Sequence, residues 1–142
     1  MKAKLLFTAI FGLFSMIVLA QETPVTLQEL PAQARTFLKN NFKSPFHHAI
    51  KDVEGTKITY DVYLNDDTEI EFDETGHWIE IDGKTKSLPT KLIQKRILDY
   101  VNLKYPKNSV TKIEREPTQY KVGLSNDIDL IFDAMGSFIK KD

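Results

Sequence analysis

Beyond its first twenty residues, the sequence carries nearly the same pattern twice, and this repeat constrains the fold more than any other feature. The pattern Tyr-x-Val-x-Leu occurs at residues 60–64 and returns at residues 120–124. The pattern Ile/Leu-x-Phe-Asp-x-x-Gly-x-Trp/Phe-Ile occurs at residues 70–79 and returns at residues 130–139. Residues that both copies share are expected to serve the fold. The repeat therefore predicts an architecture and leaves any reaction open.

The first twenty residues have the parts of a secretory signal peptide. Lys2 and Lys4 give a positive start, Leu5–Leu19 is apolar, and Ala20 is a small residue before Gln21. The apolar run has about fifteen residues, which is short of the roughly twenty that cross a bilayer. We therefore expect cleavage after Ala20, giving a periplasmic or secreted protein without a membrane span. The uncleaved alternative is a membrane anchor.

The composition limits the class of partner. Cleavage would remove two lysines, so the 19 basic residues fall to 17 against 20 acidic ones, and the net charge moves from −1 to −3. No run of basic residues exists, so nucleic acid and anionic membrane surfaces are not expected partners. The chain has no cysteine, so an exported protein of this sequence must be stabilised by its core without disulfides.

Each copy is predicted to begin with an amphipathic helix. A Leu-Pro pair opens the copies at residues 30–31 and 88–89, and proline suits the first position of a helix. One apolar stripe follows in each copy, formed by Leu30, Ala34, Phe37, Leu38 and Phe42 and by Ile93, Ile97, Tyr100 and Val101. Pro45 and Pro106 end the helices, so the second is predicted to be longer. Residues 21–29 are expected to form a polar lead.

After each helix the apolar period changes from 3.6 to 2, which predicts strands. Asp, Asn and Gly residues separate the strands, as in antiparallel hairpins. The predicted strands are residues 48–54, 58–64, 70–73 and 78–81 in the first copy and residues 109–116, 119–124, 128–133 and 137–140 in the second. 

Each copy, at residues 30–86 and 87–142, is thus predicted to be a helix followed by a four-stranded antiparallel sheet. A unit of about 60 residues is marginal alone. We therefore expect one globular α+β domain formed by tandem duplication. In this arrangement one shared sheet carries both helices on one face and leaves the other face open.

The repeated pattern behind a signal peptide resembles the PepSY-like secreted domains of Bacteroidetes, often described as β-lactamase-inhibitor-protein-like. The resemblance runs from Leu30 to Asp142 and rests mainly on core and turn positions. It implies a tandem helix-plus-sheet fold, a periplasmic or secreted location and a binding or inhibitory role. The family offers no established reaction and no catalytic residues to carry over, and the resemblance does not make this chain an inhibitor of β-lactamases.

The open face of the sheet is the first candidate site. If Ile70 and Phe72 face the helices, the side chains that alternate with them face outward. The predicted binding face comprises Asp61, Tyr63, Glu69, Glu71 and Asp129. Tyr63 is an aromatic residue on the polar side of its strand, and its counterpart is Gly123, so the fold does not require it. It is either an interface anchor or part of a cross-strand aromatic pair.

Acidic turns are the second candidate site. Clustered carboxylates suit Ca²⁺, which takes six to eight oxygen ligands. The candidate ligands are Asp66, Asp67, Asp73, Asp127 and Asp133. The alternative is turn chemistry, since Asp bonds nearby backbone N–H groups and Gly76 and Gly136 supply positive φ angles. No EF-hand loop is present, and no cofactor other than possible Ca²⁺ is expected.

Transition-metal binding and catalysis have little support. His47 and His48 are adjacent on a predicted strand and should point to opposite faces. His77 is the only other histidine, and no cysteine completes a zinc set. No serine lies in a strand–serine–helix elbow, and no glycine loop suits a phosphate.

Three functions follow from these features, in descending order. The first is a non-enzymatic binding module, with an inhibitor-like role, whose open sheet face holds an envelope protein, peptide or polymer. The second is a calcium-binding, calcium-responsive periplasmic protein. The third is a hydrolase with an unrecognised carboxylate site such as Glu69 and Glu71.

Overall fold

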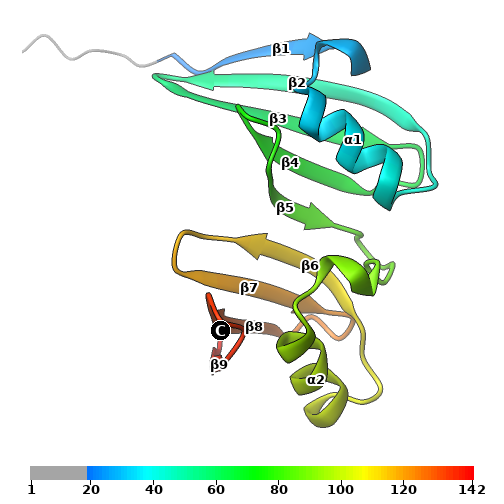
Figure 1. Cartoon of the computed structure of the whole chain (residues 1–142), viewed down its shortest axis with the longest axis vertical. Coiled ribbons are helices and arrows are strands. Elements are labelled where there is room, and N and C mark those ends of the chain that lie inside the picture. The colour runs from blue at the N-terminus through cyan, green and yellow to red at the C-terminus, as the bar shows by residue number, and fades with distance from the viewer. Residues whose placement is uncertain (1–18) are drawn as a thin grey trace, which may run out of the picture.

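The computed structural model describes residues 19–142 (Figure 1). The predicted signal peptide lies outside the described residues except for its last two positions, Leu19 and Ala20. Within residues 19–142, no helix combines the length and apolar character that crossing a membrane requires.

Two α-helices and nine strands make up the described chain. The helices α1 (Ala32–Asn41) and α2 (Lys95–Lys104) have ten residues each, and each follows a short 3₁₀ helix, η1 (Leu27–Glu29) or η2 (Thr90–Leu92). The strands are β1 (Gln21–Val25), β2 (Phe46–Glu54), β3 (Lys57–Leu64), β4 (Glu69–Asp73), β5 (Trp78–Asp82), β6 (Val110–Arg115), β7 (Gln119–Leu124), β8 (Asp129–Asp133) and β9 (Phe138–Lys141). 

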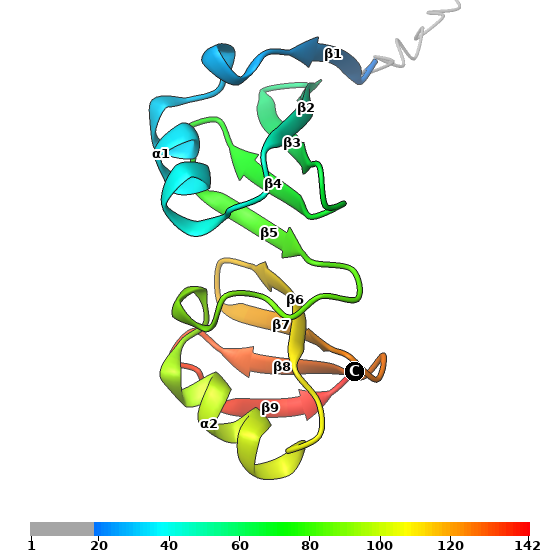
Figure 2. The ribbon, with the colours of Figure 1, turned by 90° about the vertical axis from the view of Figure 1, so that its right-hand side faces the viewer.

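The nine strands form one antiparallel sheet in chain order, β1 to β9. Strands β5 and β6 meet at its centre, and β1 and β9 are its edges. Figure 2 shows α1 and α2 on the same side of the sheet, α1 beside β2–β5 and α2 beside β6–β9. The predicted α+β class with two helices and antiparallel strands is confirmed. The side of the sheet away from the helices carries no further element of the described chain.

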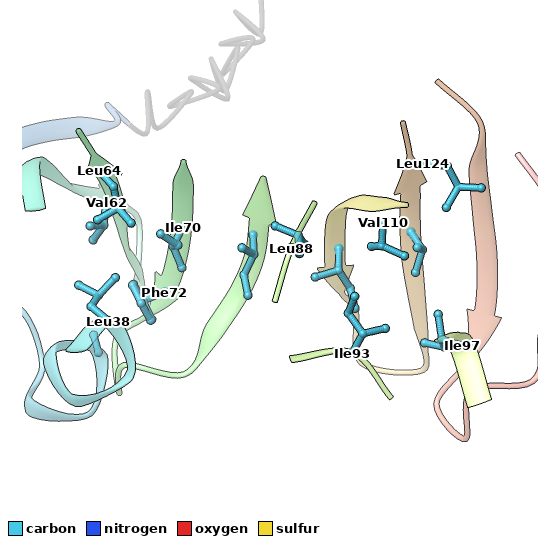
Figure 3. Packing of buried hydrophobic residues seen from close by; sticks show 14 of the residues in the cluster. Leu38, Val62, Leu64, Ile70, Phe72, Leu88, Ile93, Ile97, Val110 and Leu124 are labelled. Carbon is cyan, nitrogen blue, oxygen red and sulfur yellow. The ribbon is translucent and has the colours of Figure 1, made fainter. Parts of the chain in front are cut away.

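The core is a layer of aliphatic side chains between the helices and the sheet. One apolar residue from each of seven neighbouring strands pairs in register with the next, in the order Ala49, Val62, Ile70, Ile81, Ile113, Val122 and Leu130. All seven are buried. Ala34 and Leu38 of α1 and Ile97 and Val101 of α2 are buried against this layer, and Figure 3 shows part of the packing.

An aromatic row lies beside the aliphatic row in each half of the sheet. Tyr60 pairs with Phe72 and Phe72 with Trp78, while Tyr120 pairs with Phe132 and Phe132 with Phe138. The predicted register of these residues is confirmed. Phe72 and Phe132 have no exposed surface, as expected for core residues.

Trp78 and Phe138 depart in part from the predicted core positions. Trp78 is half-buried, with the Arg115 guanidinium carbon 4.9 Å from its ring centroid. Phe138 is 38% exposed and stacks on Tyr100, with ring centroids 4.5 Å apart. Both positions lie where the helix layer ends, so one side of each ring stays accessible.

The second helix differs from the prediction. Pro89 precedes the 3₁₀ helix η2, whereas Pro31 directly precedes α1. The position that corresponds to Pro31 is Gln94, because a Cβ added at Gly76 would lie beside Pro31 and one added at Gly136 would lie beside Gln94. The predicted equivalence of the two Leu-Pro pairs is therefore wrong. The chain is extended at Ile93, which ends η2, so α2 starts late and is no longer than α1.

The segment predicted as a polar lead is ordered into β1 and η1. β1 pairs along its whole length with β2. Thr26 and Glu29 form a capping box at η1, in which the Glu29 carboxylate accepts hydrogen bonds from the Thr26 backbone N–H and hydroxyl at 2.7 and 2.8 Å. β1 is an edge strand exposed at all positions but Val25, so it lacks the alternation by which a strand is recognised.

Candidate functional site: an acidic row on the open sheet face

The open face of the sheet carries four carboxylates on four neighbouring strands. Asp61 of β3 pairs in register with Glu71 of β4, Glu71 with Glu80 of β5, and Glu80 with Glu114 of β6. We call these four residues the acidic row. Adjacent strands lie about 4.8 Å apart, and like charges directly opposite each other destabilise a sheet. The acidic row is therefore an arrangement that packing alone would not favour.

The Asp61 and Glu71 end of the acidic row has no compensating charge. Within residues 19–142, neither carboxylate forms an ion pair, whereas Glu80 has Lys112 Nζ 2.9 Å from its Oε1 atom. Burial, followed by the negative charge of Glu69, raises the pKa of Asp61. Burial, followed by the negative charge of Asp61, raises the pKa of Glu71. These two groups are thus held where ionisation is unfavourable.

A polar hollow of about 160 Å³ opens beside this end of the acidic row. Asp52, Thr59, Asp61 and Glu71 line it, with Lys57 at its rim. The Oδ1 atom of Asp52 is buried and has no hydrogen-bond partner. An unpaired buried carboxylate oxygen costs free energy. The hollow therefore offers acceptor oxygens to a hydrogen-bond donor or a cation.

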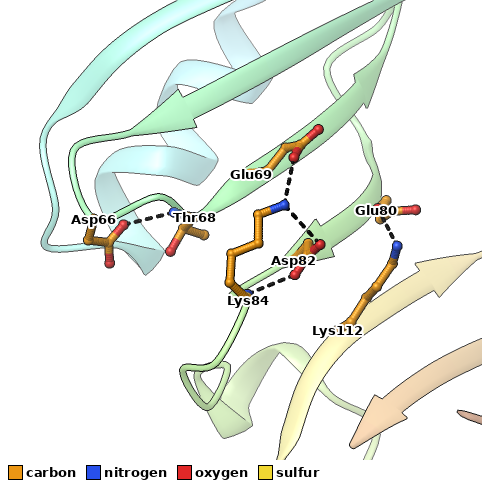
Figure 4. A network of polar contacts seen from close by, with 7 residues as sticks. All are labelled: Asp66, Thr68, Glu69, Glu80, Asp82, Lys84 and Lys112. Atoms are coloured by element: carbon orange, nitrogen blue, oxygen red, sulfur yellow. Dashed lines mark hydrogen bonds and ion pairs between the residues drawn. The ribbon is translucent and has the colours of Figure 1, made fainter. Parts of the chain in front are cut away.

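A second group of charges beside the acidic row is internally paired (Figure 4). Lys84 Nζ lies 2.8 Å from Glu69 Oε2 and 3.0 Å from Asp82 Oδ2. The hydrogen bond to Glu69 raises the pKa of Lys84 well above its usual range. Because Glu69 is held by Lys84, Glu69 and Glu71 do not form a free carboxylate pair.

Tyr63 lies at the edge of this charged group and is half-buried. Its ring stacks on the imidazole of His48 in the next strand, with centroids 4.4 Å apart and planes 4° from parallel. Burial, followed by the charge of Glu69, raises the pKa of the Tyr63 hydroxyl. The cross-strand aromatic pair that the sequence left open is present. The ring also lines a hollow of about 290 Å³, so part of it stays accessible.

The two adjacent histidines do not point to opposite faces as predicted. A register shift in β2 between Phe46 and His48 inserts an extra residue, and such a bulge breaks the alternation of side chains. The Nδ1 atoms of His47 and His48 are consequently 2.6 Å apart. The argument against these histidines from strand geometry was wrong, because a bulge is not visible in the alternation of a short strand.

Asp129 is not part of the same surface. It lies on β8, four strands from Glu69 on β4. Its Oδ2 atom is 3.7 Å from Lys121 Nζ, which also lies 2.8 Å from Asp142 Oδ2. Ile131 pairs with Lys121 and holds the place that Glu71 holds in the first half. The structure thus brings Asp61, Tyr63, Glu69 and Glu71 together and leaves Asp129 apart.

Sequence reasoning missed several residues of this surface. Glu80 and Glu114 complete the acidic row, Asp52 lines its hollow, and Lys84 and Asp82 hold Glu69. The alternation in β5 and β6 does place Glu80 and Glu114 on the outward side. Finding them required the pairing of β5 with β6, which joins strands more than thirty positions apart in the chain.

The five candidate calcium ligands are not brought together. Asp66 and Asp67 lie in the β3–β4 turn and Asp73 in the β4–β5 turn, at opposite ends of a five-residue strand, which is roughly 17 Å long. Asp127 and Asp133 are separated by β8 in the same way. Within the part of the chain that is described, no three His, Asp or Glu side chains are grouped as metal ligands.

The turn chemistry that was the alternative is present at Asp73 and Asp133. Asp73 Oδ1 accepts hydrogen bonds from the backbone N–H groups of Thr75 and His77 at 2.9 and 3.0 Å. Asp133 Oδ1 accepts from Met135 and Ser137 at 2.9 and 2.8 Å. Burial alone would raise the pKa of Asp73, but the hydrogen bonds outweigh it and lower the pKa.

A family model described as "Putative beta-lactamase-inhibitor-like, PepSY-like" matches residues 58–140. No curated protein sequence is significantly similar to the chain.

Solved structures from two Bacteroides species are similar over most of the chain. One, from Bacteroides thetaiotaomicron, is described as a "putative calcium-regulated periplasmic protein"; it is 34% identical, with 85% of this chain and 96% of the other covered and a TM-score of 0.82. A "putative periplasmic protein" of the DUF2874 family from Bacteroides vulgatus is 31% identical, with the same coverage and a TM-score of 0.81. A second Bacteroides vulgatus periplasmic protein, of unknown function, is 30% identical, with 86% and 99% covered and a TM-score of 0.83. The predicted periplasmic location is confirmed by these relatives.

Proposed function

The chain belongs to the PepSY-like family, and from that premise we propose that it is a non-enzymatic binding module of the periplasm, with an inhibitor-like role. Its open sheet face holds a protein, a peptide or an envelope polymer. The contact is centred on the first half of the face, at Asp61, Glu71, Tyr63 and the hollow beside Asp52. The observation that carries the proposal is the uncompensated pair of carboxylates, Asp61 and Glu71, at the end of the acidic row.

A cationic group of a partner would remove the unfavourable features of this surface together. A lysine or arginine side chain entering the hollow places a positive charge between Asp61 and Glu71 and gives the Asp52 Oδ1 atom a donor. Hydrogen bonds between charged groups are roughly twice as strong as neutral ones. Tyr63 adds an aromatic surface of the kind that is enriched at binding hot spots.

The difference between the two halves also supports a site in the first half. We infer that the halves derive from a duplicated unit that shares one sheet, since their aromatic rows have the same register. The core positions agree between the halves, whereas Asp61, Tyr63 and Glu71 correspond to Lys121, Gly123 and Ile131. Divergence confined to the open face is expected when one half acquires a specific contact.

Capture from a periplasmic extract tests this function. The mature protein is immobilised beside the double variant Asp61→Asn, Glu71→Gln, and retained proteins are identified by mass spectrometry. We expect a partner that wild type retains, that salt elutes because the contact is ionic, and that the variant loses. The control is Asp99→Asn, which removes an exposed charge on α2. A partner retained equally by the double variant and wild type would contradict the proposal.

A second candidate function is calcium regulation, favoured by the 34% identical relative described in those words. The acidic turns at Asp66, Asp67 and Asp127 would supply oxygen ligands singly, with water or a partner completing the shell. A calcium titration followed by thermal melting tests it. Calcium at 100 times its dissociation constant would stabilise the fold by about 2.7 kcal/mol. An unchanged melting temperature at millimolar calcium would rule it out for the isolated protein.

A further inference from the structure

A second hollow lies on the helix side of the sheet, away from the acidic row. It has a volume of about 430 Å³ and opens at the C-terminal end of α1, within the 300–1,000 Å³ range of small-molecule sites. Its lining is mostly apolar and comes from Leu27, Leu38, Phe42, Phe46 and Leu64. Leu38 and Leu64 are buried core residues whose side chains form its floor (Figure 3).

Three cations and no carboxylate border this hollow: Arg35, Lys39 and Lys43. Arg35 Nη1 donates to the backbone oxygen atoms of Gln28 and Leu30, and neutral carbonyls leave its charge uncancelled. Lys39 and Lys43 are exposed and form no ion pair among the described residues. In a chain whose mature form carries more acidic than basic residues, this is a local excess of positive charge around an apolar surface.

The corresponding place in the second half shows that the fold does not require either feature. The hollow beside α2 has a volume of only about 100 Å³. Leu98 and Asn102 line it at the positions where α1 carries Arg35 and Lys39. No charged residue borders it. The first half is therefore both wider and more cationic at the same structural position.

We propose that the hollow at the end of α1 binds a single-chain fatty-acid anion. The alkyl chain lies against Leu27, Phe42 and Phe46, where burial of each CH₂ group favours binding. The carboxylate lies at the rim beside the ammonium groups of Lys39 and Lys43. Charge complementarity selects this occupant, because an apolar floor with an uncompensated cationic rim matches a molecule that is apolar at one end and anionic at the other.

Equilibrium dialysis of the mature protein against dodecanoate, below its critical micelle concentration, tests the site. We expect saturable binding of one molecule per chain that weakens as salt is raised. Octanoate should bind more than tenfold more weakly, because it lacks four CH₂ groups and each buried CH₂ contributes up to about fourfold. Dodecylammonium, with the same chain and the opposite charge, should show no saturable binding.

Two double variants complete the test. Lys39→Glu, Lys43→Glu should weaken dodecanoate binding at least tenfold, whereas Lys104→Glu, Lys107→Glu, the same charge change beside α2, should leave it unchanged. All four lysines are exposed, and equal melting temperatures of the two variants verify that both fold. Three results would each overturn the proposal: no saturable dodecanoate binding, equal binding of dodecylammonium, or preference for a lysophospholipid with no binding of the fatty acid.

Discussion

Replacing Glu71 by glutamine should stabilise this protein while weakening partner binding. Glu71 is the centre of the acidic row, directly opposite Asp61 on one side and Glu80 on the other. Glutamine keeps the shape of the side chain and removes its charge, so the substitution relieves two like-charge contacts at once. A surface that is shaped by selection for stability alone would behave in the opposite way.

The magnitude follows from the two contacts. Cross-strand charge pairs contribute roughly 0.2–1 kcal/mol each, and both contacts here are partly screened by solvent. We therefore expect the free energy of unfolding at neutral pH to rise by about 0.5–1 kcal/mol. For a domain of this size, this corresponds to an increase in melting temperature of about 2–5 °C.

The gain should depend on pH with a definite sign. Burial and the adjacent Asp61 raise the pKa of Glu71 above its ordinary value of 4.5. The folded state therefore binds this proton more tightly than the unfolded state. Wild-type stability from this group is fully present below pH 4.5 and is lost as pH rises through the folded-state pKa. The advantage of the glutamine variant should accordingly be largest at neutral pH and disappear near pH 4.

Urea denaturation of wild type and Glu71→Gln between pH 4 and pH 8 measures this effect. The matched control is Glu74→Gln, which removes an exposed carboxylate from the β4–β5 turn and should change stability by less than about 0.5 kcal/mol. If Glu71→Gln is as stable as wild type at pH 7, or less stable, the acidic row carries no repulsive strain and the reasoning fails.

Tyr63→Ala should cost about 0.5–1.5 kcal/mol in urea denaturation, because it removes the stack on His48; a loss above 3 kcal/mol would show that Tyr63 belongs to the core. Phe72→Ala should cost about 3–5 kcal/mol as a fully buried truncation, and Trp78→Ala should cost less, because Trp78 is half-buried; the reverse order in melting temperatures would contradict the packing described. N-terminal sequencing of exported protein should read Gln21 as the first residue, and a retained leader would mean that the protein stays anchored.

Local patterns predicted the strands well, because half-buried antiparallel strands leave an alternation that the sequence displays directly. Residues 58–64 and 70–73 are strands within one residue of the prediction. Two features escaped this logic. The edge strand β1 is exposed on both faces and so has no alternation, and the bulge before His48 adds a residue without a sequence signal.

The candidate site could be predicted only within single strands. Asp61, Glu69 and Glu71 belong to one hairpin, whose register the turn fixes, and they do lie together. Glu80 and Glu114 meet through the central pairing of β5 with β6, and Asp52 depends on the long β2–β3 hairpin. Asp129 was grouped with them only by its alternation, which fixes the face of a side chain but not its distance along the sheet.

Site-specific photo-cross-linking in the periplasm tests the binding face most directly. A photoreactive phenylalanine analogue replaces Tyr63 on the first half of the open face, Lys140 on the second half, or Leu103, which is 75% exposed on α2. The account predicts one specific adduct from position 63 that the Asp61→Asn, Glu71→Gln background abolishes, and none from position 103. An adduct from position 103 or 140 alone would contradict it.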